Sequence, residues 1–368
     1  MSACEGKAFA PGRVELLGNH TDYNGGWVLG GAIQHGITAT IQATESGRVE
    51  VHSRQFSEAE SRVLSDIHPG GERGWADYVF GVVWAAKERG LPVSGMRIVL
   101  ESSLPVGAGL SSSAAVEVSV ALAMNTLFKW RLEERGELEL ARLCKEAENH
   151  YVGVGCGLLD QATSVCGEEN RIVFLDCRKE TVERIPVPTD VSLLIVHSMV
   201  EHQLSGGEYN ERREQCHEAA KLLGVPQLRD ISLQDFQKEM GKLPVLIAKR
   251  ANHIVSENHR VLQGVEALRQ QDVAQFGKLM FASHESSRMQ FENSTRELDQ
   301  LVKIAHGTHG VLGARLTGGG FGGAIVVLVE NTHAEATGNQ IAEAYHTLSG
   351  VTPIMYHTSI SRGAYPVD

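Results

Sequence analysis

The sequence lacks several patterns that define common classes of protein. It has no C-x-x-C pair among six cysteines and no H-E-x-x-H among sixteen histidines, which argues against a zinc site. No G-K-[ST] triplet occurs, so there is no Walker A loop. No apolar run is long enough to span a bilayer, and the first residues lack the pattern of a signal peptide. We therefore expect a cytoplasmic protein with reduced thiols.

Basic residues are also in short supply. The chain carries 34 Lys and Arg against 45 Asp and Glu, a net charge of −11 at pH 7. This charge argues against nucleic acid or an anionic membrane as a partner, because both require a basic surface. It does not exclude a phosphorylated ligand, since a local nest of amides and one magnesium ion can outweigh the overall field.

The chain is long enough for two domains and, at 42% hydrophobic residues, can bury a sizeable core. We place these domains at 1–180 and 181–368, with the boundary near 175–185. The order of predicted elements favours an α+β fold over a repeating βαβ sheet. Strands are predicted at 26–42, 47–54, 96–100 and 191–197, helices at 75–89 and 112–128, a helical stretch from about 206 to 270, and two strands around the glycines of 311–329.

A strand, a glycine-rich loop and a helix follow one another over residues 96–128. Glycines let the backbone approach an anion closely, and the helix start offers free amides and a favourable dipole. The serines add hydroxyls that can donate to phosphate or ligate magnesium. The same pattern also fits a tight turn with serine N-caps. The loop residues in question are Gly107, Ala108, Gly109, Leu110, Ser111, Ser112 and Ser113.

A second motif, APGRVELLGNHTDYNGG, spans residues 10–26. It places Arg13, His20 and Asp22 within ten residues of one another, before an Asn24-Gly25-Gly26 turn. Paired donors and acceptors on a short rigid loop suit a sugar hydroxyl. The alternative is a surface loop that leads into a strand.

A third motif, ENHYVGVGCGLLDQ, spans residues 148–161. Glu148 ends a predicted helix and Asp160 opens the next one, with a glycine-broken loop between them. Two such carboxylates could divide the duties of metal ligand and base. The alternative for Asp160 is a helix N-cap, and that for the glycines of 318–323 is a close backbone approach needed only for packing.

Taken together, these segments resemble the galactokinase branch of the GHMP small-molecule kinases. The resemblance is carried by APGRV-x-LLG-x-HTDYNGG, LPVGAGLSSSAAVEVSVALA and ARLTGGGFGGAIVVLV, and it continues through 208–216, 249–268 and 276–302. It implies a two-lobed GHMP kinase fold with the active site in the cleft between the lobes. It also implies a monomer that uses ATP and Mg²⁺ to phosphorylate the anomeric hydroxyl of galactose, giving galactose 1-phosphate and ADP.

The resemblance assigns roles to individual residues. Arg13 would stabilise the transition state, and Asp160 would accept the proton of the C1 hydroxyl. Ser113 and Glu148 would hold Mg²⁺. Residues 107–113 would wrap the phosphates, and Trp75 would flank the adenine, although a tryptophan on a helix is more often part of the core. The sugar would be held by Asn19, His20, Thr21, Asp22 and Tyr209, with Gly157 near the base.

One departure from the family pattern concerns the substrate. Galactokinases usually carry Asn and Glu where this chain has Glu15 and Asn19, and the residue at the Asn19 position accepts a hydrogen bond from the C6 hydroxyl. An amide accepts more weakly than a carboxylate, so galactose could bind about tenfold less tightly. Galacturonate, L-arabinose or N-acetylgalactosamine are therefore alternative substrates, unless Glu15 or a water compensates.

An alternative of another class is a non-catalytic regulator that senses sugar and ATP. Such relatives have a damaged phosphate loop. Here the serines at 111–113 are intact, and Arg13, Glu148 and Asp160 are all present, which favours a catalyst.

Overall fold

The structure is a computed structural model that describes residues 5–70, 74–105, 107–200 and 207–367. Three sequence-based predictions touch residues outside these ranges. They concern Val106 in the glycine-rich loop, residue 206 at the start of the predicted helical stretch, and Cys4 as a reduced thiol.

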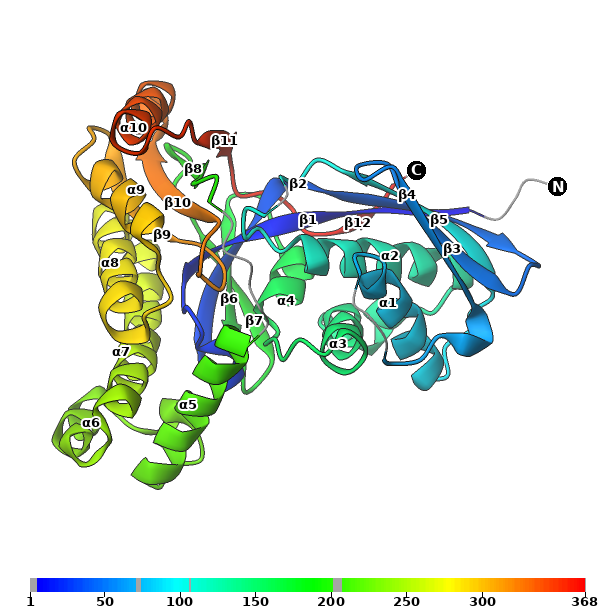
Figure 1. Ribbon diagram of the computed structural model, residues 1–368, viewed down its shortest axis with the longest axis horizontal. Coiled ribbons are helices and arrows are strands. Elements are labelled where there is room, and N and C mark those ends of the chain that lie inside the picture. The colour runs from blue at the N-terminus through cyan, green and yellow to red at the C-terminus, as the bar shows by residue number, and fades with distance from the viewer. Residues whose placement is uncertain (1–4, 71–73, 106, 201–206, 368) are drawn as a thin grey trace.

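The first lobe is built on an eight-stranded sheet whose strands run in the order β12-β1-β2-β5-β3-β4, with β6 joined to β2 and β7 to β6. All neighbours are antiparallel except β3 and β5. The last strand returns the end of the chain to β1 in this sheet (Figure 1). The strands are β1 (Glu5–Leu17), β2 (Trp27–Thr44), β3 (Arg48–Ser53), β4 (Glu58–Val63), β5 (Gly95–Ser102), β6 (Arg171–Asp176), β7 (Thr181–Pro186) and β12 (Tyr365–Pro366).

Four α-helices lie on one side of this sheet (Figure 1). The second of them, α2, packs against β1 and β2 and also contacts the other three helices. This agrees with its mostly apolar sequence, because a helix that packs against a sheet and other helices buries most of its surface, here leaving Ser112 and Thr126 exposed. The helical segments of this lobe are η1 (Asp22–Asn24), η2 (Leu64–Asp66), α1 (Asp77–Glu88), α2 (Ser112–Phe128), η3 (Leu132–Arg135), α3 (Glu139–Glu146), the π-helical turn η4 (Ala147–Val152) and α4 (Leu159–Cys166).

The second lobe has a four-stranded antiparallel sheet in the order β11-β8-β10-β9. Its strands are β8 (Val191–His197), β9 (Val311–Leu316), β10 (Ala324–Glu330) and β11 (Ile354–Thr358). Its helical segments are α5 (Gly207–Leu223), η5 (Leu228–Asp230), α6 (Leu233–Glu239), η6 (Met240–Lys242), α7 (Val245–Arg269), α8 (Val273–Ser286), η7 (Ser287–Phe291), α9 (Arg296–His306), η8 (Asn331–His333) and α10 (Ala334–Ser349).

The largest hydrophobic core runs through both lobes. It joins Leu16 and Ile33 of the first sheet to Val265 and Phe276 of α7 and α8 and to Val326 of β10. The predicted α+β class is confirmed, and the predicted strands and helices are present. A division at residue 180 would fall between β6 and β7, which pair with each other in the first sheet. The division into 1–180 and 181–368 stays a prediction.

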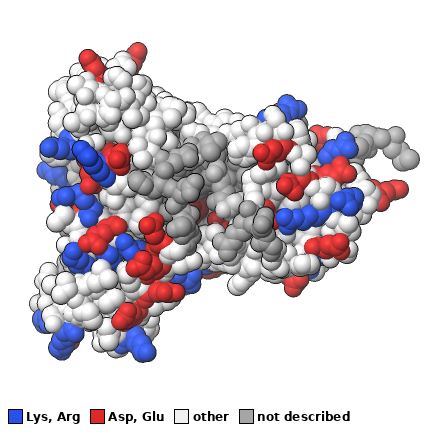
Figure 2. Space-filling model, viewed as in Figure 1, with Lys and Arg blue, Asp and Glu red and all other residues white. Residues whose placement is uncertain are grey.

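Three features of the described residues bear on the class of protein: the surface charge, the character of the helices and the state of the cysteines. On the face shown in Figure 2, acidic and basic side chains of the described residues are interspersed over both lobes. None of the helices in the described ranges has the length and apolarity needed to cross a membrane. The five cysteines within those ranges are free.

Candidate active site

A bidentate ion pair joins the second motif, residues 10–26, to the third, residues 148–161. Arg13, on β1, donates from Nε and Nη2 to the two carboxylate oxygens of Asp160, in the first turn of α4, over 2.8 Å each. Its remaining Nη1 donates to the carbonyl of Gly109 at 2.8 Å. This fork geometry is the strongest form of arginine–carboxylate contact and fixes both partners. The pair therefore ties the expected base to the glycine-rich loop.

The glycine-rich loop reaches the same carboxylate from its other side. The hydroxyl of Ser111 donates to Asp160 Oδ2, and the backbone N–H of Arg13 donates to the carbonyl of Leu110 at 3.1 Å. Ser111 precedes α2 in a left-handed conformation and makes no side-chain cap. The N-cap position of α4 belongs to Leu158. The two capping interpretations, for Ser111 and for Asp160, are therefore wrong.

The glycine-rich loop and the glycines of 318–323 together line an open cavity of about 450 Å³. Its walls are Arg13, residues 107–113 and residues 317–323, so both lobes contribute to it. The backbones meet closely: a Cβ on Gly109 would lie 3.0 Å from the carbonyl oxygen of Thr317, and one on Gly318 would lie 2.8 Å from that of Gly109. Both glycines also have positive φ. The residues at the start of α2 line this cavity, and free amides at a helix start favour an anion, so phosphate binding here stays a prediction.

A second cavity of about 260 Å³ adjoins the first and shares Pro105, Ser112 and Ser113 with it. Its apolar walls include Phe56 and Trp75. Trp75 lies just before α1 and donates from its indole N–H to Glu58 at 2.7 Å. An apolar pocket beside the cavity at the glycine-rich loop would suit an adenine ring next to bound phosphates, and the role of Trp75 stays a prediction. We call the cavity at the glycine-rich loop the phosphate cavity, after this predicted role.

The expected metal ligands lie together beside this cavity. Glu148, on the π-helical turn η4, is buried and accepts hydrogen bonds from Gln161 Nε2 at 2.6 Å and from the Ser113 hydroxyl. Burial, and then the charge of Asp160, raise the pKa of Glu148 to about 7. A cation would relieve this crowding of acidic groups.

The donor set fits Mg²⁺, which is usually held by one or two protein oxygen ligands together with substrate phosphates. Within the described residues, no group of three or more His, Cys, Asp or Glu side chains could hold a metal by itself.

Glu117, beside these groups, was missed by the sequence interpretation. It is fully buried on α2 and shares the Gln161 amide with Glu148, at 3.1 Å. Its signal was a lone acidic residue in an apolar helix.

Asp22, Gly157 and Tyr209 surround the space next to Asp160. Gly157 packs directly on Asp22, since a Cβ there would lie 2.0 Å from Asp22 Oδ2. Burial, and then the charge of Asp160, raise the pKa of Asp22 to about 6. Tyr209, on α5, brings its ring centroid to 5.0 Å from that of His20. The structure thus places these three predicted sugar residues together.

His20 and Thr21 have their polar side-chain atoms committed to the protein. His20 pairs through Nε2 with the carbonyl of Gly319 at 2.9 Å and through Nδ1 with the hydroxyl of Tyr23 at 2.8 Å. Burial lowers its pKa to about 3, so the ring is neutral, donates to Gly319 and accepts from Tyr23. The Thr21 hydroxyl lies 2.8 Å and 2.7 Å from the carbonyl oxygens of Gly18 and Trp27.

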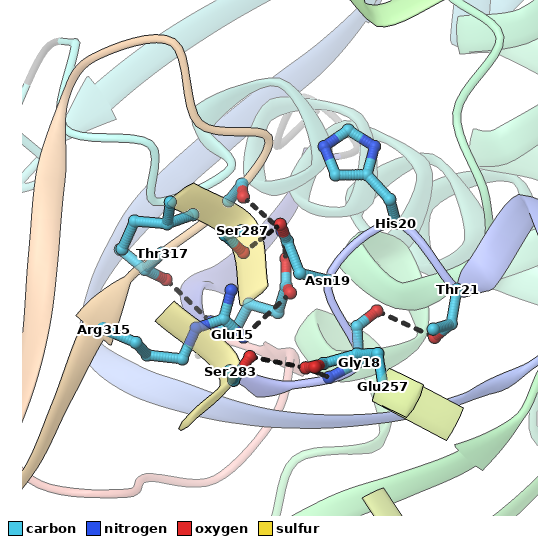
Figure 3. Close-up of polar contacts among 12 residues, drawn as sticks. Glu15, Gly18, Asn19, His20, Thr21, Glu257, Ser283, Ser287, Arg315 and Thr317 are labelled. Atoms are coloured by element: carbon cyan, nitrogen blue, oxygen red, sulfur yellow. Dashed lines mark hydrogen bonds and ion pairs between the residues drawn. The ribbon is translucent and has the colours of Figure 1, made fainter. Parts of the chain in front are cut away.

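Asn19 was expected to contact the sugar, and this expectation stays a prediction, because the structure shows its side chain among protein groups. Its side chain is 0% exposed, and Figure 3 shows it directed into a cluster with Glu15, Ser287 and Arg315. Its Nδ2 donates to the carbonyl of Gly318 at 2.9 Å and to Glu15 at 3.3 Å. Its Oδ1 accepts from Asn293 at 2.8 Å and from Ser287 at 3.2 Å. All four hydrogen-bonding positions of the amide are occupied by protein groups.

Comparisons with known proteins identify the family of the chain. The family model for the GHMP kinase N-terminal domain matches residues 77–168, and that for the GHMP kinase C-terminal domain matches residues 265–347. The galactokinase galactose-binding signature matches residues 2–43. The fold and its three motifs thus define a GHMP kinase.

Close relatives narrow this class. A galactokinase of Haemophilus influenzae is 41% identical over 360 residues, which cover 96% of this chain and 93% of that protein. A galactokinase of Thermotoga maritima is 38% identical over 363 residues, 98% of this chain and 100% of that protein. The crystal structure of Lactococcus lactis galactokinase complexed with galactose superimposes with a TM-score of 0.94 at 31% identity, covering 99% of this chain and 95% of that one. The chain belongs to the galactokinase family.

More distant structures share the fold alone. The mevalonate kinase of Methanococcus jannaschii superimposes with a TM-score of 0.65 at 18% identity. The predicted two-lobed GHMP kinase fold is confirmed.

Proposed function

We propose that the protein transfers the γ-phosphoryl group of ATP to the anomeric hydroxyl of galactose, giving galactose 1-phosphate and ADP. The observation that carries this proposal is the Arg13–Asp160 pair, which lies between the phosphate cavity and the group of Asp22, Gly157 and Tyr209. Membership of the galactokinase family and the galactose-binding signature at residues 2–43 support the choice of sugar.

Asp160 is arranged to orient the sugar and to take one proton. A carboxylate offers about four lone-pair positions. Two N–H groups of Arg13 and the hydroxyl of Ser111 occupy three of them. The side chain is still 27% exposed, which leaves one position for the C1 hydroxyl. As the bond between the C1 oxygen and the γ-phosphorus forms and the bond to the bridging oxygen of ADP breaks, the proton passes to Asp160.

Arg13 supplies fixed positive charge at the point of transfer. It lines the phosphate cavity while its donors hold Asp160 and the carbonyl of Gly109, so it needs no reorganisation during the reaction. Ser113 and Glu148 would hold Mg²⁺, which supplies charge neutralisation for the phosphates. Backbone amides of residues 107–113 bind and orient the nucleotide phosphates.

The structure weakens the reason to expect a substrate other than galactose. Galacturonate, L-arabinose and N-acetylgalactosamine were considered because Asn19 replaces an acidic residue at the expected C6 contact. Since the Asn19 amide is saturated by protein groups, the exchange does not by itself disfavour galactose. The regulator alternative is not favoured either, because Asp160, Arg13 and the serine-rich loop form a connected site. The monomeric state and the cytoplasmic location remain predictions.

The test is an ADP-release assay of the purified protein with ATP and Mg²⁺. The acceptors are galactose, galacturonate, L-arabinose, N-acetylgalactosamine and glucose, compared by kcat/KM. We expect galactose to exceed every other sugar by at least about tenfold, the effect of one well-placed hydrogen bond. If another sugar gave the highest kcat/KM, galactose would be the wrong substrate. If no sugar in the panel led to ADP release, the proposed kinase activity would be wrong.

A further inference from the structure

Three consecutive residues at the start of the glycine cluster 317–323 form hydrogen bonds with the segment 15–20 of the second motif. The backbone N–H of Glu15 donates to the hydroxyl of Thr317 at 2.8 Å. Asn19 donates to the carbonyl of Gly318 at 2.9 Å, and His20 contacts the carbonyl of Gly319 at 2.9 Å. The same residues, 317–319, form part of the wall of the phosphate cavity. The segment that surrounds the sugar therefore also sets the position of a loop that faces the nucleotide.

Asn19 is the best fixed of these contacts. Its oxygen accepts from Asn293 and Ser287, and its second N–H is directed at Glu15. The side-chain amide of Asn293 in turn donates to the carbonyl of Gly319 at 3.0 Å. The backbone carbonyl of Asn293 accepts from the backbone N–H of Phe321 at 2.7 Å. The amide can therefore neither rotate nor move without breaking several buried hydrogen bonds, each of which is costly to lose.

Charge accounts for the presence of an amide at position 19. Glu15 forms an ion pair with Arg315 at 3.2 Å, and both side chains are almost completely buried (Figure 3). A carboxylate at position 19 would face the carbonyl of Gly318 without a hydrogen to donate. It would also place a second acidic group at the 3.3 Å contact with Glu15, whose own pKa burial already raises to about 7, so the two groups could not both ionise without cost. Buried like charges at that distance repel strongly.

We infer that Asn19 is a positioning residue for the nucleotide, which holds residues 317–319 against the phosphate cavity through the carbonyl of Gly318 and makes no contact with the sugar. The inference rests on the proposed kinase function. It explains the exchange of Glu15 and Asn19 by the packing of the glycine cluster 317–323, and substrate choice stays with Asp22, Gly157 and Tyr209.

The experiment compares Asn19→Asp with the wild-type protein. This substitution keeps the shape of the side chain but removes the donor to Gly318. We expect KM for ATP to rise about tenfold, the scale of one lost buried hydrogen bond, with kcat lowered and KM for galactose changed by less than about twofold. The Kd for MgATP without sugar, measured by calorimetry, should weaken by the same factor. Asn293→Leu, which removes the donor to Gly319, should give the same split if Asn19→Asp fails to fold.

A matched control is Asn258→Asp, the same buried amide-to-acid change on α7. Asn258 accepts from the N–H of Trp27 at 3.1 Å and makes no contact with residues 317–319 among its hydrogen bonds. The Asn258→Asp substitution should lower the melting temperature and leave the KM values for ATP and for galactose at the wild-type level.

In Asn19→Asp, a rise in KM for galactose with unchanged ATP affinity would overturn the inference, as would equal rises in both KM values. Absence of galactose turnover by the wild-type protein would overturn the proposed function instead, because the calorimetric ATP measurement would still stand.

Discussion

At the scale of single residues, most polar side chains of the candidate site have their hydrogen-bonding positions occupied by other protein groups. Asp160 keeps one lone-pair position open after binding Arg13 and Ser111, whereas Asn19 keeps none. Both residues belong to motifs that the sequence marks clearly. Motif spacing predicts that such residues are near the site, but only their hydrogen bonds distinguish a residue that reacts from one that supports.

The first prediction concerns Asp160. Replacing it by Asn removes the proton acceptor while keeping an oxygen for one N–H of Arg13. We expect kcat to fall by at least about a hundredfold, the usual contribution of a general base, with circular dichroism unchanged. Turnover at the wild-type rate would exclude Asp160 as the base.

The second prediction concerns the pH dependence of galactose use. The pKa of Asp22 is raised to about 6, mainly by burial and then by the charge of Asp160. Its carboxylate is ionised above this pH and could then accept hydrogen bonds from the sugar, and it becomes protonated below this pH. We expect kcat/KM for galactose to fall as the pH drops through 6, because this ratio reports groups of the free enzyme. Asp22→Asn should lack this acid limb, and an unchanged limb in that variant would assign it to another group.

At the scale of elements, the loop of residues 153–158 and the short helix η1 (Asp22–Asn24) form one packing unit. Gly157 has no Cβ at the place where the Asp22 carboxylate lies. Its φ is not positive, so its role is space and not backbone conformation. This contact crosses more than a hundred residues of sequence, and no local pattern announces it.

The third prediction is that Gly157→Ala displaces Asp22. An added Cβ would lie 2.0 Å from Asp22 Oδ2, so the carboxylate must move. We expect KM for galactose to rise about tenfold, the effect of one misplaced hydrogen bond, with KM for ATP little changed. Gly241→Ala is the control, because a Cβ there meets nothing within 4 Å. Equal effects of the two substitutions would refute the steric explanation.

Sequence reasoning predicted regular elements better than contacts between them. The predicted strand at 191–197 is β8 and the predicted helix at 112–128 is α2, because periodicity reports which faces are buried. The polar strand β7 and the π-helical turn that carries Glu148 have no such signal. The burial of Asn19 depends on Asn293 and Gly318, which lie far away in sequence, so the sequence alone left Asn19 as a sugar contact.

At the scale of the whole molecule, the two lobes share one core. Phe276 of α8 is 1% exposed and belongs to the same hydrophobic cluster as Leu16 of the first sheet and Val326 of the second. A core shared in this way couples the unfolding of the lobes. It also holds the cavity walls, which come from both lobes, in a fixed relation.

The fourth prediction follows from this shared core. Phe276→Ala should destabilise the protein by about 3–5 kcal/mol, the range for removing a buried phenylalanine side chain, and calorimetry should still show one transition. Leu348→Ala, at a side chain 59% exposed, should change stability by less than about 0.5 kcal/mol. Two resolved transitions, with only one shifted by Phe276→Ala, would show that the lobes unfold independently.

The most direct test of the account identifies the product. The protein is incubated with galactose, ATP and Mg²⁺, and the sugar phosphate is analysed by ³¹P and ¹H NMR. We predict that the new phosphorus signal couples to the proton on the anomeric carbon, because in the proposed mechanism Asp160 and Arg13 hold the C1 hydroxyl beside the γ-phosphate. Coupling to the protons on C6, or the absence of a sugar phosphate, would contradict the account.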